Sequence, residues 1–261
     1  MKTALNPPTL HHDTPYFHER FFAAIAPLAF DAASWGKIGG FDFYFCKPRN
    51  HDPAKKNIML AGGFHGEEPA GNWSIVHFLE SATPEELATH NISLMPLVNP
   101  TGFHVGRRLN DWGGNPNEGF IGDKRKISVE GELMVAHLGE ILPAAKHGFL
   151  SLHEDSDFTE AYLWLNAASK NPEPMASAIR HAQEQHFGIF SGKIEHRDGF
   201  VFIENGLGFN ATDDSFETLL INNGVPITAT PESPAHSSVP LDKRIVCNRD
   251  VIASFIKTLA L

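Results

Sequence analysis

The chain has few cysteines, no long apolar run and no excess of basic residues. Its only two cysteines among 261 residues, Cys46 and Cys247, are too few to staple a domain of this size, and we expect both to be reduced thiols. No segment approaches the roughly 20 apolar residues of a membrane span, and the N-terminus has no apolar core of signal-peptide length. A cytoplasmic location without a membrane anchor is therefore expected.

Positive charge is also scarce. Lysine and arginine total 21 against 31 aspartates and glutamates, which gives a formal net charge of −10. This sign opposes binding to nucleic acids or to anionic membranes, so we expect neither as a partner. The composition does not indicate an oligomeric state.

The sequence does contain enough apolar residues, 42%, to form one substantial core, and it shows no repeat or long linker, so a single domain over residues 1–261 is expected. Strand and helix patterns alternate, which is typical of an α/β sheet with helices on both faces and sites at the C-terminal ends of its strands. The expected strands are 41–46, 57–61, 92–98, 148–152, 161–165, 200–203 and 227–229, and the expected helices are the first half of 16–33, then 68–80, 130–142, 173–186, 215–222 and 249–259.

The stretch AGGFHGEEPAGN at 61–72 follows the second of these strands. His65 and Glu68 are three residues apart where a strand ends and a helix begins, so one turn can direct both side chains at one metal ion. Glu68 could instead only cap the helix while His65 lies on the surface. Glu67 is expected to point elsewhere on the turn and to be solvated.

A hydrolytic zinc site usually has three protein ligands, so a third is needed. In LSLHEDSD, His153 directly follows an apolar strand, where a sheet presents side chains to a cleft. A histidine in this position is more often structural when it stands alone. Glu154 and Asp155 could orient imidazole rings.

Two further stretches could supply catalytic groups. After the turn signal NPTG at 99–102 come Arg107 and Arg108, and a guanidinium beside a metal can hold the oxyanion that forms when water attacks a carbonyl. In VPITATPESP, Glu232 follows an apolar strand and could accept a proton from water and return it to a leaving amine. Glu217 is the competing carboxylate, but it lies within an expected helix and a solvated position is favoured for it.

In order along residues 58 to 233, the chain contains H-x-x-E, N-P-x-G with an arginine six residues after the glycine, a strand-end L-x-L-H and a strand-end T-x-E. This series resembles the zinc carboxypeptidase family, including its murein peptide amidases and its succinylglutamate desuccinylase and aspartoacylase branch. The resemblance implies a mixed, mostly parallel eight-stranded sheet flanked by helices.

The resemblance also implies roles for particular residues. His65, Glu68 and His153 would bind one Zn²⁺ ion, and Glu232 would be the general base and acid. Arg108 would polarise the substrate carbonyl, with Arg107 as the fallback if the loop is shifted by one residue.

The sequence departs from the family pattern at the substrate end of the site. Where the family has an Asn-Arg pair that clamps a terminal carboxylate, this chain has Asn117 and Glu118. An acidic residue there would repel a carboxylate and favour an amide, a neutral end or an amine. A cation from the nearby basic run KRK at 124–126 could restore the clamp.

These features predict a zinc-dependent hydrolase that cleaves an amide bond in a small peptide, of the metallocarboxypeptidase or peptide amidase type. The short spacing of Glu68 and His153, which are 85 positions apart, instead resembles that of the N-acyl amino acid deacylase branch. The absence of a tyrosine between Tyr162 and Glu232 sets the chain apart from digestive carboxypeptidases, which carry one on a mobile loop. A catalytically silent metal-binding homologue is the remaining alternative.

Overall fold

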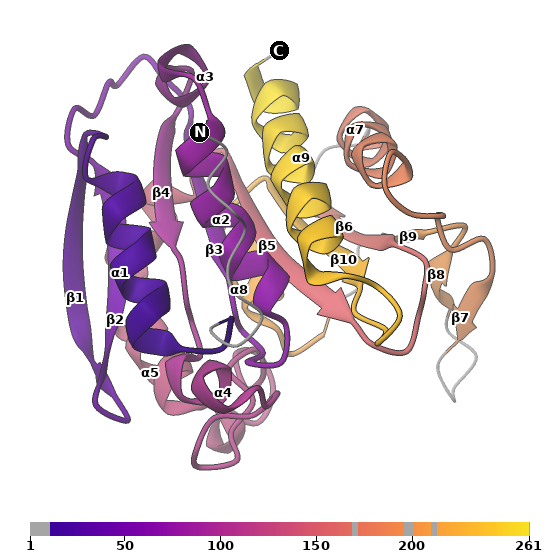
Figure 1. Cartoon of the computed structure of the whole chain (residues 1–261), viewed down its shortest axis with the longest axis horizontal. Coiled ribbons are helices and arrows are strands. Elements are labelled where there is room, and N and C mark those ends of the chain that lie inside the picture. Colours follow the sequence, from indigo (N-terminus) through magenta and orange to yellow (C-terminus); the bar gives the residue numbers. More distant parts are fainter. Residues whose placement is uncertain (1–10, 169–171, 196–200, 210–212, 261) are drawn as a thin grey trace.

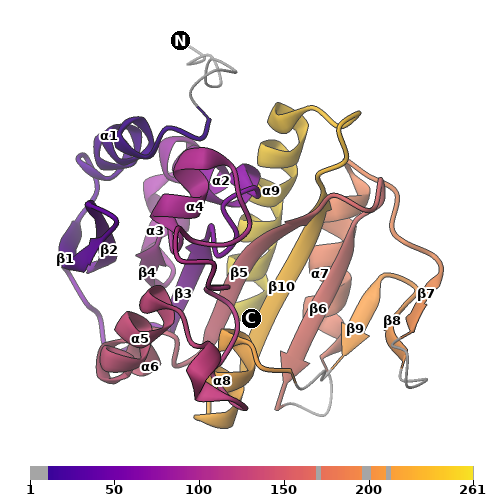
Figure 2. The ribbon, with the colours of Figure 1, turned by 90° about the horizontal axis from the view of Figure 1, so that it is seen from below.

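The computed structural model describes residues 11–168, 172–195, 201–209 and 213–260. Within them, ten strands form one sheet in the order β1-β2-β4-β3-β5-β10-β6-β9-β8-β7, which Figure 2 shows from one edge to the other. The strands are β1 Phe30–Ile38, β2 Phe41–Pro48, β3 Asn57–Gly62, β4 Asn91–Met95, β5 Gly148–Asp155, β6 Tyr162–Ala167, β7 Lys193–Glu195, β8 Val201–Glu204, β9 Leu207–Phe209 and β10 Ile227–Pro234.

Helices cover both faces of this sheet. Helices α1, α2, α7 and α9 pack on one face, and α5, α6 and α8 on the other (Figures 1 and 2). No helix in the described ranges is long and apolar enough to cross a membrane. The helices are α1 Thr14–Ile25, α2 Pro69–Ser81, α3 Pro84–Ala88, α4 Pro100–Val105, α5 Val129–Ala136, α6 Leu138–Ala144, α7 Glu173–Glu184, α8 Phe216–Asn222 and α9 Leu241–Ala260, with a short 3-10 helix at Lys124–Lys126.

The mixed α/β sheet that the sequence predicts is confirmed, with ten strands in place of eight. The parallel pairs are β4 with β3, β3 with β5, β5 with β10, and β6 with β9. The other pairs are antiparallel. Four of the nine pairs among the described strands are parallel, so the sheet is mixed as expected but not mostly parallel, and the run of parallel neighbours is confined to β4, β3, β5 and β10.

The central strands are buried on both faces. Along β3, Leu60 packs into the core beneath α2 and α9, whereas its neighbour Met59 packs into the core on the other face. On β5, Leu150 packs on the same face as Leu60, and Phe149 packs on the same face as Met59. Because successive side chains of a strand point to opposite faces, a continuous apolar run is what a strand covered by two layers of helices requires.

Several elements differ from the sequence prediction. The sequence pattern does not predict β1, α3, α4, β7 or β9. The single helix expected at 130–142 is divided into α5 and α6 at His137, and α9 begins at Leu241 instead of Arg249. Phe200 of the expected strand 200–203 lies outside the described residues. The ends of β5 and β10 matter most, because these strands run on to include His153 and Glu232.

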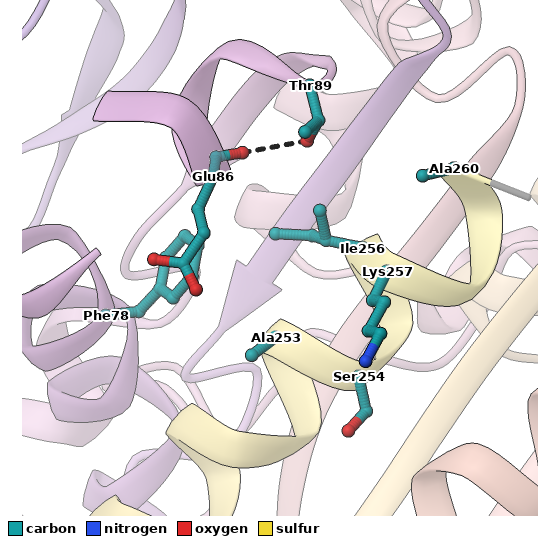
Figure 3. Close-up of a pocket in the computed structure, with 8 residues that line it drawn as sticks. All are labelled: Phe78, Glu86, Thr89, Ala253, Ser254, Ile256, Lys257 and Ala260. Carbon is teal, nitrogen blue, oxygen red and sulfur yellow. Dashed lines mark hydrogen bonds between the residues drawn. The ribbon is translucent and has the colours of Figure 1, made fainter. Parts of the chain in front are cut away.

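A mostly apolar pocket of about 280 Å³ lies between α2, α3 and the C-terminal half of α9 (Figure 3). Of the described residues that line it, only Glu86 and Lys257 are ionisable. The Glu86 carboxylate already accepts a hydrogen bond from the Thr83 backbone in the capping box of α3. Since the pocket lacks a cluster of reactive groups, it is not a candidate catalytic site.

Candidate metal centre

The loop after β3 depends on two glycines to turn the chain back toward the sheet. Gly63 has a φ of 70°, in the left-handed region where glycine is favoured, and a Cβ there would lie 2.2 Å from the Asn72 side chain. A Cβ on Gly66 would lie 2.0 Å from the backbone carbon of Gly102. The loop that carries His65 therefore packs backbone to backbone on the turn that precedes Arg108.

We expect Gly66→Ala to destabilise the protein by about 1–3 kcal/mol, because the added methyl group meets backbone atoms that have no room to move. Chemical denaturation with and without added zinc would measure the change. Gly139→Ala in α6 is the matched control, since a Cβ there has nothing within 4 Å. Equal stability of the two variants would contradict this role for the close approach.

Glu68 lies between the two histidines. His65 Nδ1 is 2.7 Å from Glu68 Oε1, and His153 Nδ1 is 2.9 Å from Glu68 Oε2. Glu68 stands at the N-cap position of α2, yet its side chain makes no capping hydrogen bond. The alternative in which Glu68 only caps the helix and His65 lies on the surface is wrong, because all three side chains are buried.

The outer ring nitrogens of both histidines have partners of their own. His65 Nε2 is 3.2 Å from Asn115 Oδ1, and His153 Nε2 is 3.0 Å from the Ser151 hydroxyl. Such contacts fix the orientation of each ring and leave both Nδ1 atoms directed at Glu68. Ser151 precedes His153 by two residues on β5, so the alternation of the strand puts both on one face; Asn115 carries no comparable signal in the sequence.

The pKa values of Glu68 and His153 are both shifted in this cluster. Burial alone would raise the pKa of Glu68, but His65 and His153 hold it well below its usual range. Burial lowers the pKa of His153, but the attraction of Glu68, followed by Glu232 and Glu217, outweighs it and raises that pKa to about 9. The cluster therefore contains an ionised carboxylate that is stabilised by adjacent positive charge.

This arrangement fits a metal ion. One ligand atom from each of His65, Glu68 and His153 lies within 4.8 Å of the other two, and all three residues are buried. Two imidazoles and one carboxylate form a common donor set of catalytic zinc. A divalent cation would supply the positive charge that Glu68 otherwise draws from protonated imidazole. These residues could thus hold a metal ion.

Glu232 lies directly beside the cluster. It is the register partner of His153 on the parallel neighbour β5, and of Tyr162 on the antiparallel neighbour β6. Its Oε2 atom is buried and has no hydrogen-bond partner among the described residues. Burial and then the charges of Glu68 and Asp155 raise the pKa of Glu232 well above its usual range, although His153 opposes this. Such a carboxyl can accept a proton near neutral pH.

The two arginines of the loop after α4 separate in the structure. Arg108 Nη1 is 3.3 Å from Glu68 Oε1, so its guanidinium reaches the cluster. Asn99 supports this position by donating to the Arg108 carbonyl at 3.0 Å. Arg107 instead pairs with Asp111 at the surface, 2.6 Å away. Arg107 does not line the cavity described below.

The candidate substrate residues Asn117 and Glu118 do not face the same cavity either. Asn117 donates to Glu217 and accepts from the Phe216 backbone, at 3.0 and 2.9 Å, so it ties its loop to the start of α8. Glu118 is an exposed partner of Lys126, with 2.9 Å between Oε1 and Nζ. The cation from the basic run thus pairs with Glu118, outside the cavity.

A cavity of about 710 Å³ opens over the cluster. It is lined by His65, Glu68, Arg108 and Glu232, by Glu154 and Asp155, and by residues that the sequence does not indicate, among them Tyr162 and Arg244. Tyr162 adjoins Glu232 on β6, and Arg244 lies in the first turns of α9. Neither residue belongs to a recognisable sequence motif, so their position at the cavity becomes apparent only from the strand pairing and helix packing of the folded chain.

Three acidic residues differ from their sequence predictions. Glu217 is buried and lies 3.9 Å from His153 Nε2, so the solvated position expected for it is wrong. Glu67 is only partly exposed, and its Oε1 is 3.5 Å from Arg108 Nη1. Glu154 pairs with Arg244 and accepts a hydrogen bond from the Ala70 backbone, and among the described residues its carboxylate makes no hydrogen bond to an imidazole.

Solved structures share this fold. A protein from Shewanella baltica, described as a candidate metallopeptidase, is 31% identical, with a TM-score of 0.88 over 95% of this chain and 92% of that one. A metallo-carboxypeptidase from Burkholderia cenocepacia is 13% identical, with a TM-score of 0.68 over 92% of this chain and 67% of that one. Murein-tripeptide amidase from Escherichia coli O157 is 16% identical, with a TM-score of 0.56 over 87% and 91% of the two chains.

The last two likenesses are to chains of low identity and show the fold alone, which is that of the zinc carboxypeptidases. No curated protein sequence matches the chain significantly. The family model for the succinylglutamate desuccinylase/aspartoacylase catalytic domain matches residues 54–195, a range that contains His65, Glu68, Arg108 and His153. With this match and the Shewanella baltica relative, the chain belongs to the succinylglutamate desuccinylase/aspartoacylase family.

Proposed function

We propose that the protein is a zinc-dependent hydrolase that cleaves an amide bond of a small peptide. The observation that carries this proposal is a buried cluster of His65, Glu68 and His153 beside Glu232, the register partner of His153, under a cavity that His65, Glu68 and Glu232 line. His65, Glu68 and His153 would hold one zinc ion, and the whole chain would form one catalytic domain. A zinc ion held there supplies Lewis acidity, which acidifies water and polarises a carbonyl group.

Glu232 and Arg108 carry out the proton transfer and the stabilisation of the oxyanion. Glu232 accepts the proton of the attacking water, because its carboxylate is partly desolvated and its Oε2 has no other described partner. Glu232 then returns the proton to the departing nitrogen. Arg108 donates a hydrogen bond to the carbonyl oxygen as negative charge develops on it.

We expect Arg108→Met to lower kcat by about 100- to 1000-fold while zinc content stays at the wild-type level, because one oxyanion donor is lost. Steady-state kinetics with elemental analysis would measure both quantities. Arg107→Met provides the matched control and tests the fallback assignment, since Arg107 pairs with Asp111 at the surface. A larger loss in the Arg107 variant than in the Arg108 variant would reverse the assignment.

A second candidate function is hydrolysis of an N-acyl amino acid. The family match favours it, as does the 85-residue spacing between Glu68 and His153. The NPTG turn, which forms the start of α4, is nearer to the peptidases, and on this ground we place the peptide first.

The two functions are separated by turnover on a panel of dipeptides, murein tripeptide and N-acyl amino acids. Each substrate is assayed with the zinc-loaded protein, with a chelator, and after zinc is restored. We expect zinc-dependent release of an amino acid or short peptide from the peptide substrates. Turnover of N-acyl amino acids alone would favour the deacylase, and no zinc-dependent turnover would favour the catalytically silent homologue.

A further inference from the structure

The cavity over the metal cluster is also lined by residues of the chain's N-terminal segment and of α9, among them His11, His12 and Leu241. Of the described residues that line the cavity, Arg108 and Arg244 are the only arginines or lysines. Because Arg108 lies against Glu68, Arg244 is the cation that the metal cluster does not engage.

Arg244 is held in place by a buried carboxylate. Its Nη1 donates to Glu154 Oε1, and the Glu154 side chain is fully buried. Glu154 Oε2 accepts from the Ala70 backbone at 2.7 Å, and the Glu154 backbone donates to Glu68 Oε2 at 3.2 Å. One residue thus connects Arg244 to a candidate metal ligand and fixes the guanidinium relative to the reacting end of the cavity.

The guanidinium of Arg244 also has N–H groups without a hydrogen-bond partner among the described residues. Its Nε atom is buried and has no hydrogen-bond partner among the described residues, and the side chain is 12% exposed. A guanidinium has five N–H donors in a planar fork that matches a carboxylate. Nε itself is enclosed, so an anion in the cavity would instead meet the outer N–H groups, of which only Nη1 has a hydrogen-bond partner among the described residues, and would gain a charge-assisted hydrogen bond there.

We propose that Arg244 binds a free carboxylate of the substrate and so determines specificity. This inference rests on the proposed function for the site as a whole. It places the carboxylate-binding cation on α9 and not in the loop that holds Asn117 and Glu118. Glu118 does not repel such a substrate, because it lies outside the cavity and pairs with Lys126.

The competing role for Arg244 is to neutralise Glu154 and nothing more. In that case, loss of the guanidinium would lower the thermal stability and would weaken binding of charged and neutral ligands equally. If Arg244 contacts the substrate, its loss would weaken binding of ligands with a carboxylate and spare those in which a carboxamide replaces it. Comparison of the two ligand types therefore separates specificity from structure.

The test uses zinc-loaded protein with Glu232→Gln, which suppresses hydrolysis, and isothermal titration calorimetry. The ligands are N-acetyl dipeptides ending in alanine, glutamate or lysine, each as the free acid and as the C-terminal amide. We expect at least one acid to bind about 10- to 100-fold more tightly than its amide. Arg244→Gln should abolish that preference, and the matched variant Lys243→Gln on the same helix should keep it.

Several results would overturn the proposal. These are equal affinities for acid and amide across the panel, no binding of any acid, and a preference that survives Arg244→Gln. Binding is measured without turnover, so it tests Arg244 independently of catalysis. If the hydrolase proposal alone were wrong, the wild-type protein would bind the acids more tightly than the amides and would cleave none of them. Circular dichroism of Arg244→Gln would confirm that the variant used in the comparison is folded.

Discussion

Glu232→Gln should retain one zinc ion per chain and lower kcat by about 100- to 10,000-fold, the range typical of a lost general acid or base. Glutamine keeps the shape of the side chain but cannot accept the proton from water. Glu232 is not among the three clustered candidate ligands, so metal content should not change. Stopped assays on the best substrate of the panel, with elemental analysis of the same preparations, would measure both effects.

The matched control for this variant is Glu130→Gln. Glu130 is a buried carboxyl whose pKa is also raised by burial, and it accepts a hydrogen bond from Asn110 at 2.7 Å, outside the cavity. We expect its amide variant to retain kcat within a few-fold of wild type. If Glu232→Gln were equally active, Glu232 could not be the base.

His153→Ala should lose the metal and with it essentially all turnover. The variant removes one of the three clustered ligand atoms and leaves a buried Glu68 with one imidazole in place of two. Breaking a buried charge pair from one side typically costs about 3–5 kcal/mol, so we also expect a lower melting temperature. Zinc content and thermal unfolding would be measured on one preparation.

Two further variants keep this prediction interpretable. His153→Gln retains a hydrogen-bonding side chain and should fold better than the alanine variant, yet it should still lose zinc. His181→Ala, at an exposed position of α7, controls for removal of a histidine as such and should keep its zinc. A His153→Gln protein with full zinc occupancy would remove His153 from the ligand set.

The reacting end of the site can be predicted from the sequence because each of its residues follows a strand signal. The strand at 57–61, the strand at 148–152 and the strand at 227–229 are apolar runs, and parallel central strands bring their carboxyl ends to one edge of the sheet. His65, His153 and Glu232 follow these runs closely in the sequence. The structure therefore brings together the residues that the motifs single out.

The substrate end cannot be predicted in this way because its groups have no local pattern. Arg244 belongs to a helix that begins eight residues before the expected start, and nothing in the sequence indicates that it meets Glu154. Asn117 and Glu118 occupy the expected loop, but hydrogen bonds to α8 and to Lys126 determine where they point. Long-range contacts of this kind appear only in the folded chain.

Two other features, strand β1 and the burial of Glu217, also could not be predicted from the sequence. Strand β1 reads FDAASWGKI and most of it is exposed at the edge of the sheet, so it lacks the alternation that identifies a strand. Glu217 lies in a seven-residue helix that packs beneath β10 and β6. An acidic residue in so short a helix is expected to be exposed to solvent. In the structure, however, Glu217 is buried and its carboxylate accepts a hydrogen bond from Asn117.

The proposed zinc site is tested most directly by a crystal structure of the protein purified without chelators, with anomalous diffraction data on both sides of the zinc absorption edge. We predict one strong zinc peak per chain, within bonding distance of His65 Nδ1, His153 Nδ1 and a Glu68 carboxylate oxygen, with Glu232 nearby but unbound. A zinc peak held by other residues, or no zinc peak in a crystal supplied with excess zinc, would contradict the assignment of His65, Glu68 and His153 as the zinc ligands.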